Sequence, residues 1–247
     1  MADVVTYDSA DGIATITINR PEKMNAIDAA VETGLADAWR RFNASQDRVA
    51  ILAGAGERAF SVGKDLSSDS TPDYRRFVPS YDIAVKKPII AAVNGWCIGG
   101  ALTLVMAADL CVAADNARFM YPEAKIGFAG GLIAGLAGRM PHKVAMEVML
   151  LGEELSAERA YQVGFVNKLT PPGETLEAAR AYARRLADNA PLVLEMLKGF
   201  AGQVVPAGPM ERASHALREV EAVMSSDDFR EGFASRRENR KPNFTGS

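Results

Sequence analysis

The glycine pair Gly99-Gly100 constrains the fold of this chain most, because strand-like residues precede it and helix-like residues follow it. Residues 88–93 (PIIAAV) are typical of a buried strand, and residues 101–108 (ALTLVMAA) are typical of a helix. Glycines at such a junction leave backbone N–H groups uncovered at the positive end of the helix dipole. These groups can hold an anion or a developing oxyanion, although a tight turn that needs small residues only for packing would show the same pair.

A second glycine-opened loop follows another strand-like run. Residues 57–66 (ERAFSVGKDL) follow the apolar residues 49–54 after two intervening residues and pass through Gly63. Farther along the chain, Glu123 follows a proline and is itself followed by several glycines. Two backbone donor sites and one carboxylate are the groups needed to polarise a carbonyl and to move a proton beside it.

These segments resemble the crotonase (enoyl-CoA hydratase/isomerase) family. The resemblance lies in residues 19–26 (NRPEKMNA), 59–66 (AFSVGKDL) and 92–101 (AVNGWCIGGA). Residues 228–233 (DFREGF) and 240–244 (RKPNF) resemble the C-terminal segment of the same family. The blocks occur in family order and span nearly the whole chain, so together they are far more specific than any one of them.

Short strands that alternate with helices predict the α/β class. The expected strands are 4–7, 13–18, 49–54, 88–93 and 110–113, and the expected helices are 27–42, 99–108, 144–151, 157–163, 176–190, 192–200 and 210–223. The resemblance implies a crotonase-like spiral of ββα turns followed by a C-terminal helical part. We expect residues 1–195 to form the spiral α/β core with the CoA and active sites, and residues 196–247 to form a helical oligomerisation segment.

The resemblance also implies a catalytic set. The backbone N–H groups of Lys64 and Gly100 would form an oxyanion hole that stabilises the enolate of a CoA thioester. Glu123 matches a glutamate that transfers protons in hydratases and many isomerases of the family. Desolvation beside an apolar acyl chain would raise the pKa of this carboxyl above its ordinary value and bring it closer to the working pH.

Two positions depart from the family pattern. The hydratases have a second glutamate three residues after the oxyanion glycine, where this chain has Thr103. A threonine hydroxyl can orient a water but is a poor base, so Thr103 is expected to contact substrate rather than replace the carboxylate. Some dehalogenases and dienoyl isomerases have an aspartate where this chain has Gly131, which disfavours their chemistry.

By the same resemblance, CoA is the substrate carrier and no cofactor is expected. No metal is expected either, because the chain has two histidines and no Cys/His cluster at metal-ligand spacing. The residues expected to bind CoA are Lys23, Ala26, Ser61 and Val62, with Lys241 and Phe244 reaching the CoA of a neighbouring subunit. Residues 67–72 are polar and predict either an ordinary surface loop or a segment that covers the substrate. The family's helical end implies a homotrimer or a dimer of trimers.

The single strong acid/base group favours an enoyl-CoA double-bond isomerase. The alternatives are a 2-enoyl-CoA hydratase, an acyl-CoA hydrolase, and a non-catalytic homologue that binds CoA or RNA. A net charge of −3 and the lack of an interleaved basic and aromatic patch argue against nucleic acid. Two cysteines, Cys97 and Cys111, in apolar surroundings are expected to be reduced core residues.

Membrane insertion is not expected. Residues 88–108 carry no charge and are long enough to span a bilayer, but a proline and two glycine-containing turns divide them into a strand, a turn and a helix. The first residues lack the basic and apolar pattern of a signal peptide, so the sequence predicts a cytoplasmic protein.

Overall fold

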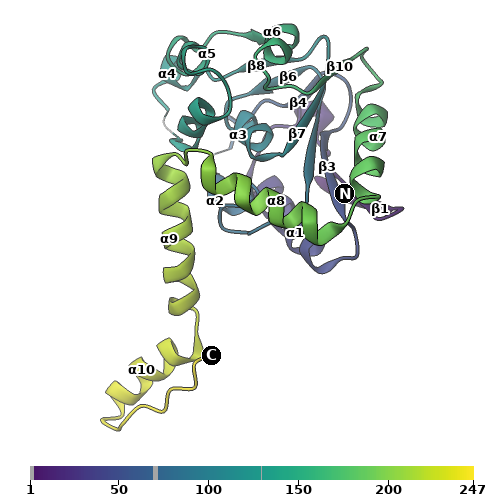
Figure 1. Cartoon of the computed structure of the whole chain (residues 1–247). Coiled ribbons are helices and arrows are strands. Elements are labelled where there is room, and N and C mark those ends of the chain that lie inside the picture. The colour runs from purple at the N-terminus through teal and green to yellow at the C-terminus, as the bar shows by residue number, and fades with distance from the viewer. Residues whose placement is uncertain (1–2, 69–71, 129) are drawn as a thin grey trace.

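The computed structural model describes residues 3–68, 72–128 and 130–247. Figure 1 shows two sheets and their helices gathered in one body, from which the last two helices extend as an arm. The arm contains α9 (Pro209–Met224) and α10 (Asp227–Arg237). The layers of the body position the candidate site, and the arm carries the C-terminal end of the chain.

A six-stranded sheet forms the centre of the body, in the order β1-β2-β3-β5-β7-β10. Its strands are β1 (Val5–Ala10), β2 (Ile13–Ile18), β3 (Val49–Gly54), β5 (Ile89–Val93), β7 (Leu110–Ala114) and β10 (Lys168–Thr170). The first two strands form an antiparallel hairpin through a turn at Asp11 and Gly12, and the remaining neighbours are parallel. The register aligns Ile16 with Leu52 and Leu52 with Ala91, so apolar side chains stack across the sheet.

A second, four-stranded sheet has the order β4-β6-β8-β9. Its strands are β4 (Ala59–Ser61), β6 (Trp96–Ile98), β8 (Arg118–Met120) and β9 (Leu155–Ser156). Each of the first three follows a strand of the large sheet and leads into a helix, so the chain makes successive ββα turns. The expected spiral α/β fold is therefore confirmed. The sequence did not predict these short strands, and β6 rather than β5 directly precedes the glycine pair.

Two long helices cover opposite faces of the large sheet (Figure 1). In α1 (Ala29–Ala44), Val31, Leu35, Trp39 and Phe42 are fully buried, as their helical spacing predicted. The Asp28 carboxylate begins this helix by accepting the backbone N–H groups of Ala30 and Val31, each at 3.0 Å. The other face is covered by α7 (Thr175–Ala187), whose small residues Ala179 and Ala183 pack against the strands.

Short helical segments connect these elements. They are η1 (Pro21–Lys23), α2 (Tyr74–Phe77), α3 (Gly100–Ala107), α4 (Glu123–Ile126), η2 (Leu132–Gly138), α5 (His142–Met146), η3 (Glu147–Leu151) and α6 (Ala157–Gln162). The segment expected to be one helix over 144–151 is therefore divided into an α-helix and a π-turn. Both cysteines are buried and free, as expected. Part of the polar segment predicted over 67–72 lies outside the described residues.

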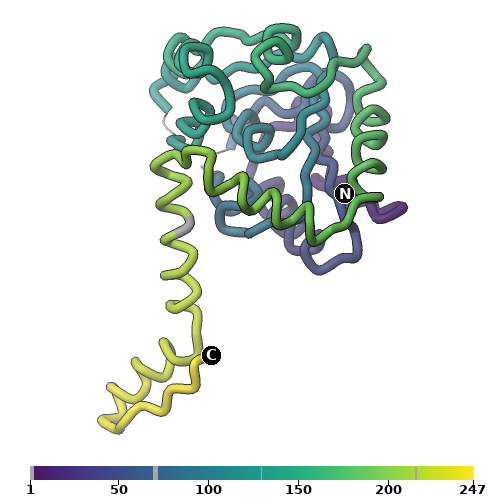
Figure 2. Tube along the Cα trace, in the orientation of Figure 1, coloured from purple at the N-terminus to yellow at the C-terminus, as the bar shows by residue number. Residues whose placement is uncertain are grey.

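The helical end begins with α8 (Pro191–Val204), which crosses the body before the chain turns into the arm (Figure 2). The C-terminal residues fold back beside α10, where the backbone N–H of Asp227 donates to the carbonyl of Ser247 at 2.7 Å. The predicted boundary between residues 195 and 196 falls within α8, so this helix belongs to both predicted parts. That division of the chain stays a prediction.

Buried polar contacts join the arm to the body. The Glu211 carboxylate is only 7% exposed and accepts hydrogen bonds from Arg139 at 2.7 Å and from Tyr81 at 3.2 Å. It also accepts the backbone N–H of Gly208, the N-cap residue of α9. Glu211 therefore fixes the direction in which α9 leaves the body.

Candidate active site

The site begins where two loops pair. The backbone N–H of Ile27 donates to the carbonyl of Gly63 at 2.7 Å, and the N–H of Asp65 donates to the carbonyl of Ile27 at 2.8 Å. These bonds form a parallel bridge between Ile27 and Lys64. In such a bridge the N–H and C=O of the middle residue point away from its partner. The backbone N–H of Lys64 is therefore directed away from Ile27, toward the start of α3.

The glycine pair lies directly beside this loop. Gly99 is the N-cap of α3 with φ +61°, a conformation that favours glycine, and Gly100 is the first helical residue. The N–H of a first helical residue has no carbonyl partner within its own helix. A β-carbon on Gly63 would lie 2.7 Å from the carbonyl oxygen of Ile98 and 3.2 Å from the Gly100 nitrogen. The backbones of Lys64 and Gly100 therefore lie side by side, as an oxyanion hole would require.

Glu123 reaches the same place from the first residue of α4. Its side chain is buried, and its Oε1 atom lies 2.7 Å from where a β-carbon on Gly99 would be. Among the described residues, Oε2 is buried without a hydrogen-bond partner. Desolvation by burial raises the pKa of Glu123 to about 7, although its own backbone N–H partly offsets this effect. A carboxyl with this pKa can both accept and return a proton near neutral pH.

A small cavity of about 10 Å³ lies beside Gly100 and Glu123. It is lined by Tyr74, Gly100, Thr103, Tyr121, Glu123, Phe128, Gly130, Leu132 and Ile133. The Thr103 hydroxyl is buried and donates to the carbonyl of Gly100 at 2.6 Å, so its proton is committed to α3. Of the predicted site residues, Gly100, Thr103 and Glu123 meet in one cavity, and the backbone of Lys64 lies beside it.

The two segments expected to bind CoA also lie together. The backbone N–H of Val62 donates to the carbonyl of Met24 at 3.2 Å. The Ser61 hydroxyl is fully buried and donates to the carbonyl of Asn25 at 2.7 Å, so its side chain connects the loops. Lys23 is exposed on the adjacent turn, and the buried Ala26 accepts a hydrogen bond from Arg20 at 2.7 Å. In this pair of loops, the exposed ammonium of Lys23 remains accessible to a ligand.

Lys241 and Phe244 belong to the C-terminal residues that run back beside α10 in the arm (Figure 1). Both are exposed, and the Phe244 ring packs near Gly232 of α10. A single chain therefore does not bring them to the cavity around Glu123. Their predicted contact with the CoA of a neighbouring subunit stays a prediction.

Sequence reasoning missed the two tyrosines of the cavity. Tyr74 comes from α2 and Tyr121 from the residue after β8. Tyr121 stands two positions before Glu123, a spacing that could have drawn attention to it. Nothing in the local sequence marks Tyr74, because only the long return of the chain from β4 brings it to Gly100.

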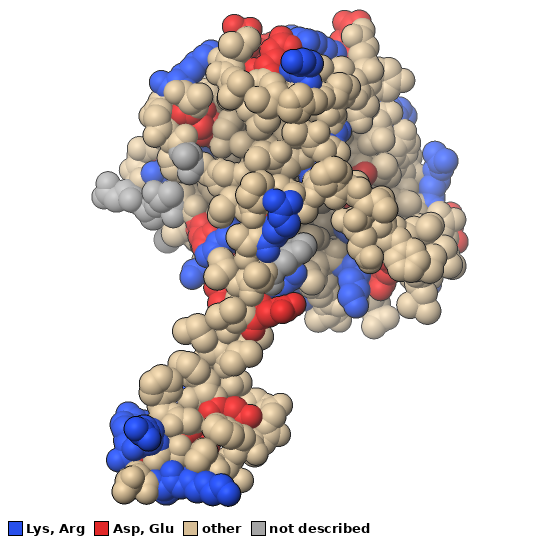
Figure 3. Space-filling view, turned by 60° about the vertical axis from the view of Figure 1, so that its left-hand side comes forward, with Lys and Arg blue, Asp and Glu red and all other residues tan. Residues whose placement is uncertain are grey.

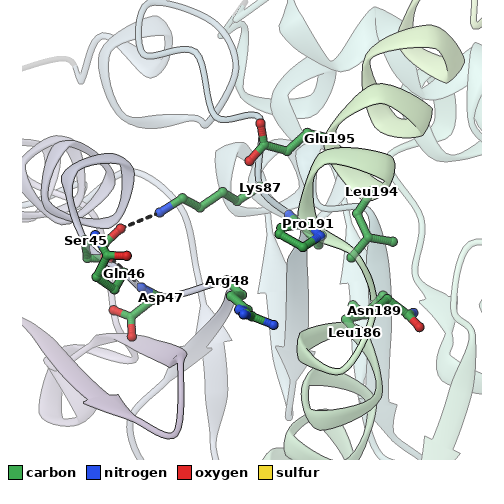
Figure 4. A pocket seen from close by; sticks show the side chains of 11 residues that line it. Ser45, Gln46, Asp47, Arg48, Lys87, Leu186, Asn189, Pro191, Leu194 and Glu195 are labelled. Atoms are coloured by element: carbon green, nitrogen blue, oxygen red, sulfur yellow. Dashed lines mark hydrogen bonds between the residues drawn. The ribbon is translucent and has the colours of Figure 1, made fainter.

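Another hollow, of about 220 Å³, lies at the amino ends of β3 and β5 (Figure 4). Lys87 crosses it and donates to the carbonyls of Phe42 and Ser45, both at 2.8 Å. Arg48 donates to the carbonyl of Ala187 at 2.8 Å. Both cations donate hydrogen bonds to backbone carbonyls at the ends of α1 and α7, and residues of α8 also line the hollow. The hollow is therefore a structural junction between these three helices.

The described part of the chain contains no group of three or more His, Cys, Asp or Glu side chains arranged to hold a metal ion. None of its helices is both long enough and apolar enough to cross a membrane.

Comparison with known proteins identifies the family of this chain. The family model described as enoyl-CoA hydratase/isomerase matches residues 8–247. An (E)-benzylidenesuccinyl-CoA hydratase of Thauera aromatica is 35% identical over 258 aligned positions, covering 98% of this chain and 99% of that protein. A carnitinyl-CoA dehydratase of Salmonella arizonae is 36% identical, with 95% of each chain covered.

Solved structures agree over the full length. A carnitinyl-CoA dehydratase from Mycobacterium avium 104 superposes with a TM-score of 0.77 at 34% identity, with 100% of both chains covered. An enoyl-CoA hydratase from Mycobacterium tuberculosis H37Rv gives the same TM-score at 36% identity, again with 100% of both chains covered. The chain belongs to the enoyl-CoA hydratase/isomerase, or crotonase, family of acyl-CoA enzymes.

Proposed function

We propose that this enzyme moves the double bond of an enoyl-CoA thioester, with Glu123 as the single proton carrier. The observation that carries the proposal is the chemistry of the cavity lining. Among its described residues, Glu123 is the one carboxylate, and Thr103 stands where the family's hydratases have their second glutamate. Isomerisation requires one group that removes a proton and returns it, whereas the two-carboxylate route to hydration holds a water between two acids.

The reaction would begin with a 3-enoyl-CoA whose thioester oxygen accepts the N–H groups of Lys64 and Gly100. Glu123 takes a proton from C2, and the electron pair spreads over the dienolate oxygen, C2 and C4. The same carboxyl returns the proton to C4, which leaves the double bond between C2 and C3. Each backbone donor on such an oxyanion is typically worth about 3 kcal/mol in the transition state, and a pKa near 7 suits both proton transfers.

Reversible hydration of a 2-enoyl-CoA is the second candidate. It is favoured by the names of the relatives, which are hydratases and dehydratases. In this route the oxygen of Thr103 would accept a hydrogen bond from the attacking water, because its proton is already donated to Gly100. Glu123 would then have to serve both as the base toward water and as the acid toward C2.

We propose that CoA itself is the only carrier required, with no further cofactor. The Lys23 ammonium would contact a CoA phosphate, and the backbones at Ala26, Ser61 and Val62 would line its path. Lys23 is exposed on a turn whose next residue, Met24, pairs with Val62 in the loop of Lys64, which supports this assignment.

We also propose a homotrimer or a dimer of trimers built through the helical end. Exposed apolar side chains are concentrated on its helices: Leu192, Val193, Met196, Leu197, Phe200, Val204, Leu217, Val220, Val223, Met224, Phe229 and Phe233. In the space-filling view, uncharged surface covers much of the arm, and the basic side chains gather at its far end (Figure 3). An apolar surface of this extent is expected to pack on another copy, where Lys241 and Phe244 would approach a neighbour's CoA.

A paired assay of the purified protein tests the reaction type. One arm follows formation of 2-enoyl-CoA from 3-enoyl-CoA, and the other follows loss of the conjugated thioester of 2-enoyl-CoA on hydration. We expect isomerisation to be the faster reaction by at least about tenfold and to fall by about 10²-fold or more in Glu123→Gln. Thr103→Val should raise the ratio of isomerisation to hydration, because it removes the oxygen available to water. Hydration faster than isomerisation in the unmodified protein would instead establish the second candidate.

A further inference from the structure

The aromatic ring of Tyr74 lies against Gly100, one of the two residues whose backbone N–H groups we propose bind the substrate carbonyl. A β-carbon built on Gly100 would be 1.8 Å from Cε1 of Tyr74, 2.0 Å from Cζ and 2.2 Å from the hydroxyl oxygen. The phenol therefore lies directly against the first residue of α3. The side chain is only 8% exposed, and it lines the same cavity as Glu123 and Thr103.

The Tyr74 hydroxyl also meets the other half of the predicted oxyanion hole. A backbone hydrogen bond from Lys64 reaches this oxygen and partly offsets the rise in the Tyr74 pKa that burial and the charge of Glu123 cause. The bridge to Ile27 directs the N–H of Lys64 to this side of its loop. The phenol oxygen thus accepts a hydrogen bond from the N–H group that we expect to donate to a thioester oxygen.

The cavity has no room for both groups. About 10 Å³ remains free beside the ring, which is less than the volume of a thioester group and close to the minimum for one water molecule. A thioester carbonyl can therefore enter only if the Tyr74 side chain leaves.

The backbone of α2 is anchored, although the side chain must move. The indole N–H of Trp39 donates to the carbonyl of Phe77 at 2.8 Å, and the backbone N–H of Asp73 donates to Glu32 at 3.0 Å. Both partners belong to α1. Rotation of the Tyr74 side chain is therefore the motion that clears the cavity with least disturbance to the body.

We infer that Tyr74 occupies the oxyanion hole of the free enzyme and is displaced by the thioester carbonyl of an acyl-CoA. This inference rests on the proposed function, because it takes the backbones of Lys64 and Gly100 to be the oxyanion hole. Tyr74 is then a specificity-determining residue. An acyl-CoA that displaces the phenol gains a hydrogen bond from the backbone N–H of Lys64. CoA thiol has no thioester carbonyl that can take the place of the phenol.

Calorimetric titration with butyryl-CoA and with CoA thiol tests the inference. Butyryl-CoA is saturated and has no double bond to move or hydrate, so binding is measured without turnover. Tyr74→Phe keeps the ring but removes the oxygen that competes for the Lys64 N–H. We expect this variant to bind butyryl-CoA about two- to tenfold more tightly than the unmodified protein does, since one hydrogen bond need no longer be broken. Its affinity for CoA thiol should equal that of the unmodified protein.

Tyr81→Phe is the matched control. It removes another buried phenol from the same segment, but its hydroxyl donates to Glu211 rather than entering the cavity. Its affinity for butyryl-CoA should stay within about twofold of the unmodified protein. Tyr74→Ser adds a variant without the ring, and tighter binding by it would support the same conclusion.

The possible failures are distinguishable. If the unmodified protein binds butyryl-CoA and Tyr74→Phe binds it no more tightly, Tyr74 does not compete with the carbonyl and the inference alone is overturned. Equal tightening toward butyryl-CoA and CoA thiol would also overturn it, because the effect would not depend on a carbonyl. If no folded form of the protein binds butyryl-CoA, the proposed function and the inference fall together.

Discussion

Glu123 packs against Gly99 so closely that its Oε1 atom lies 2.7 Å from the position of a β-carbon on that glycine. On the other side of the pair, Gly100 faces the ring of Tyr74. A β-carbon at either position would meet Glu123 or Tyr74. The glycine pair therefore leaves the space that the Glu123 carboxylate and the Tyr74 ring occupy at the start of α3.

The first prediction concerns Gly99→Ala. The new methyl group would meet the Glu123 carboxylate, and the residue would have to keep φ +61°, so we expect the reaction rate to fall by about 10²-fold or more. Gly164→Ala is the control, because Gly164 has φ +80° but nothing within 4 Å of its β-carbon position. Similar losses of activity in both variants would show that backbone strain, rather than contact with Glu123, is responsible.

The second prediction is the pH dependence of the rate. The base must be ionised to take a proton from C2, and burial raises the pKa of Glu123 to about 7. We therefore expect kcat/KM for 3-enoyl-CoA to rise as the pH increases through about 7 and then to level off. Initial rates between pH 5 and 9 measure it. A rise centred near the ordinary pKa of glutamate would contradict the assignment of Glu123 as a buried base.

The third prediction links the same shift to stability. The pKa is raised on folding, from 4.5 to about 7, so the folded state binds the proton more tightly than the unfolded state. The stabilisation that comes from this tighter proton binding is complete below about pH 4.5 and is lost as the pH rises through about 7. Glu123→Gln removes this dependence. Between pH 4.5 and pH 8, the free energy of unfolding of the unmodified protein should therefore fall by roughly 2–3 kcal/mol relative to that of Glu123→Gln. Urea unfolding at both pH values measures the difference, and an equal effect of the substitution at each would refute it.

The fourth prediction concerns the junction of arm and body. Glu211→Ala leaves Arg139 and Tyr81 without their carboxylate partner and removes the acceptor of the Gly208 N–H at the start of α9. We expect a loss of about 3 kcal/mol in the free energy of unfolding. Glu177→Ala, whose pair with Arg184 is more than half exposed on both sides, should change it by about 0.5 kcal/mol or less. Comparable losses in the two variants would mean that Glu211 has no special structural role.

The fifth prediction addresses assembly. Val220 and Val223 are 51% and 66% exposed on α9, and replacing both by Asp should prevent an apolar interface from forming. Light scattering coupled to size-exclusion chromatography should show a mass that falls toward 26.4 kDa, the mass of one chain. Glu177→Lys, a charge reversal on the body helix α7, should leave the assembled mass unchanged. A single-chain mass for the unmodified protein would contradict the proposed assembly.

Much of the fold could be predicted from local sequence patterns. The burial of Leu35, Trp39 and Phe42 follows from their helical spacing, and β3 and β5 are continuous apolar runs because both faces of the sheet are covered. The strands β4, β6 and β8 escaped prediction because three residues are too few to show a period. They form only because the preceding parallel strands hold their ends in register.

Residue types and their order along the chain are enough to assign the family, the α/β class and the identity of the chemical groups. They also identify Thr103 and Glu123 as candidates, and the structure brings both to the cavity beside Gly100. The surroundings of Glu123 and the position of Tyr74 depend instead on how the folded chain packs. The Glu123 pKa follows from burial, and Tyr74 reaches Gly100 through the packing of α2 on α1. Both are properties of residues distant in sequence, which no local pattern contains.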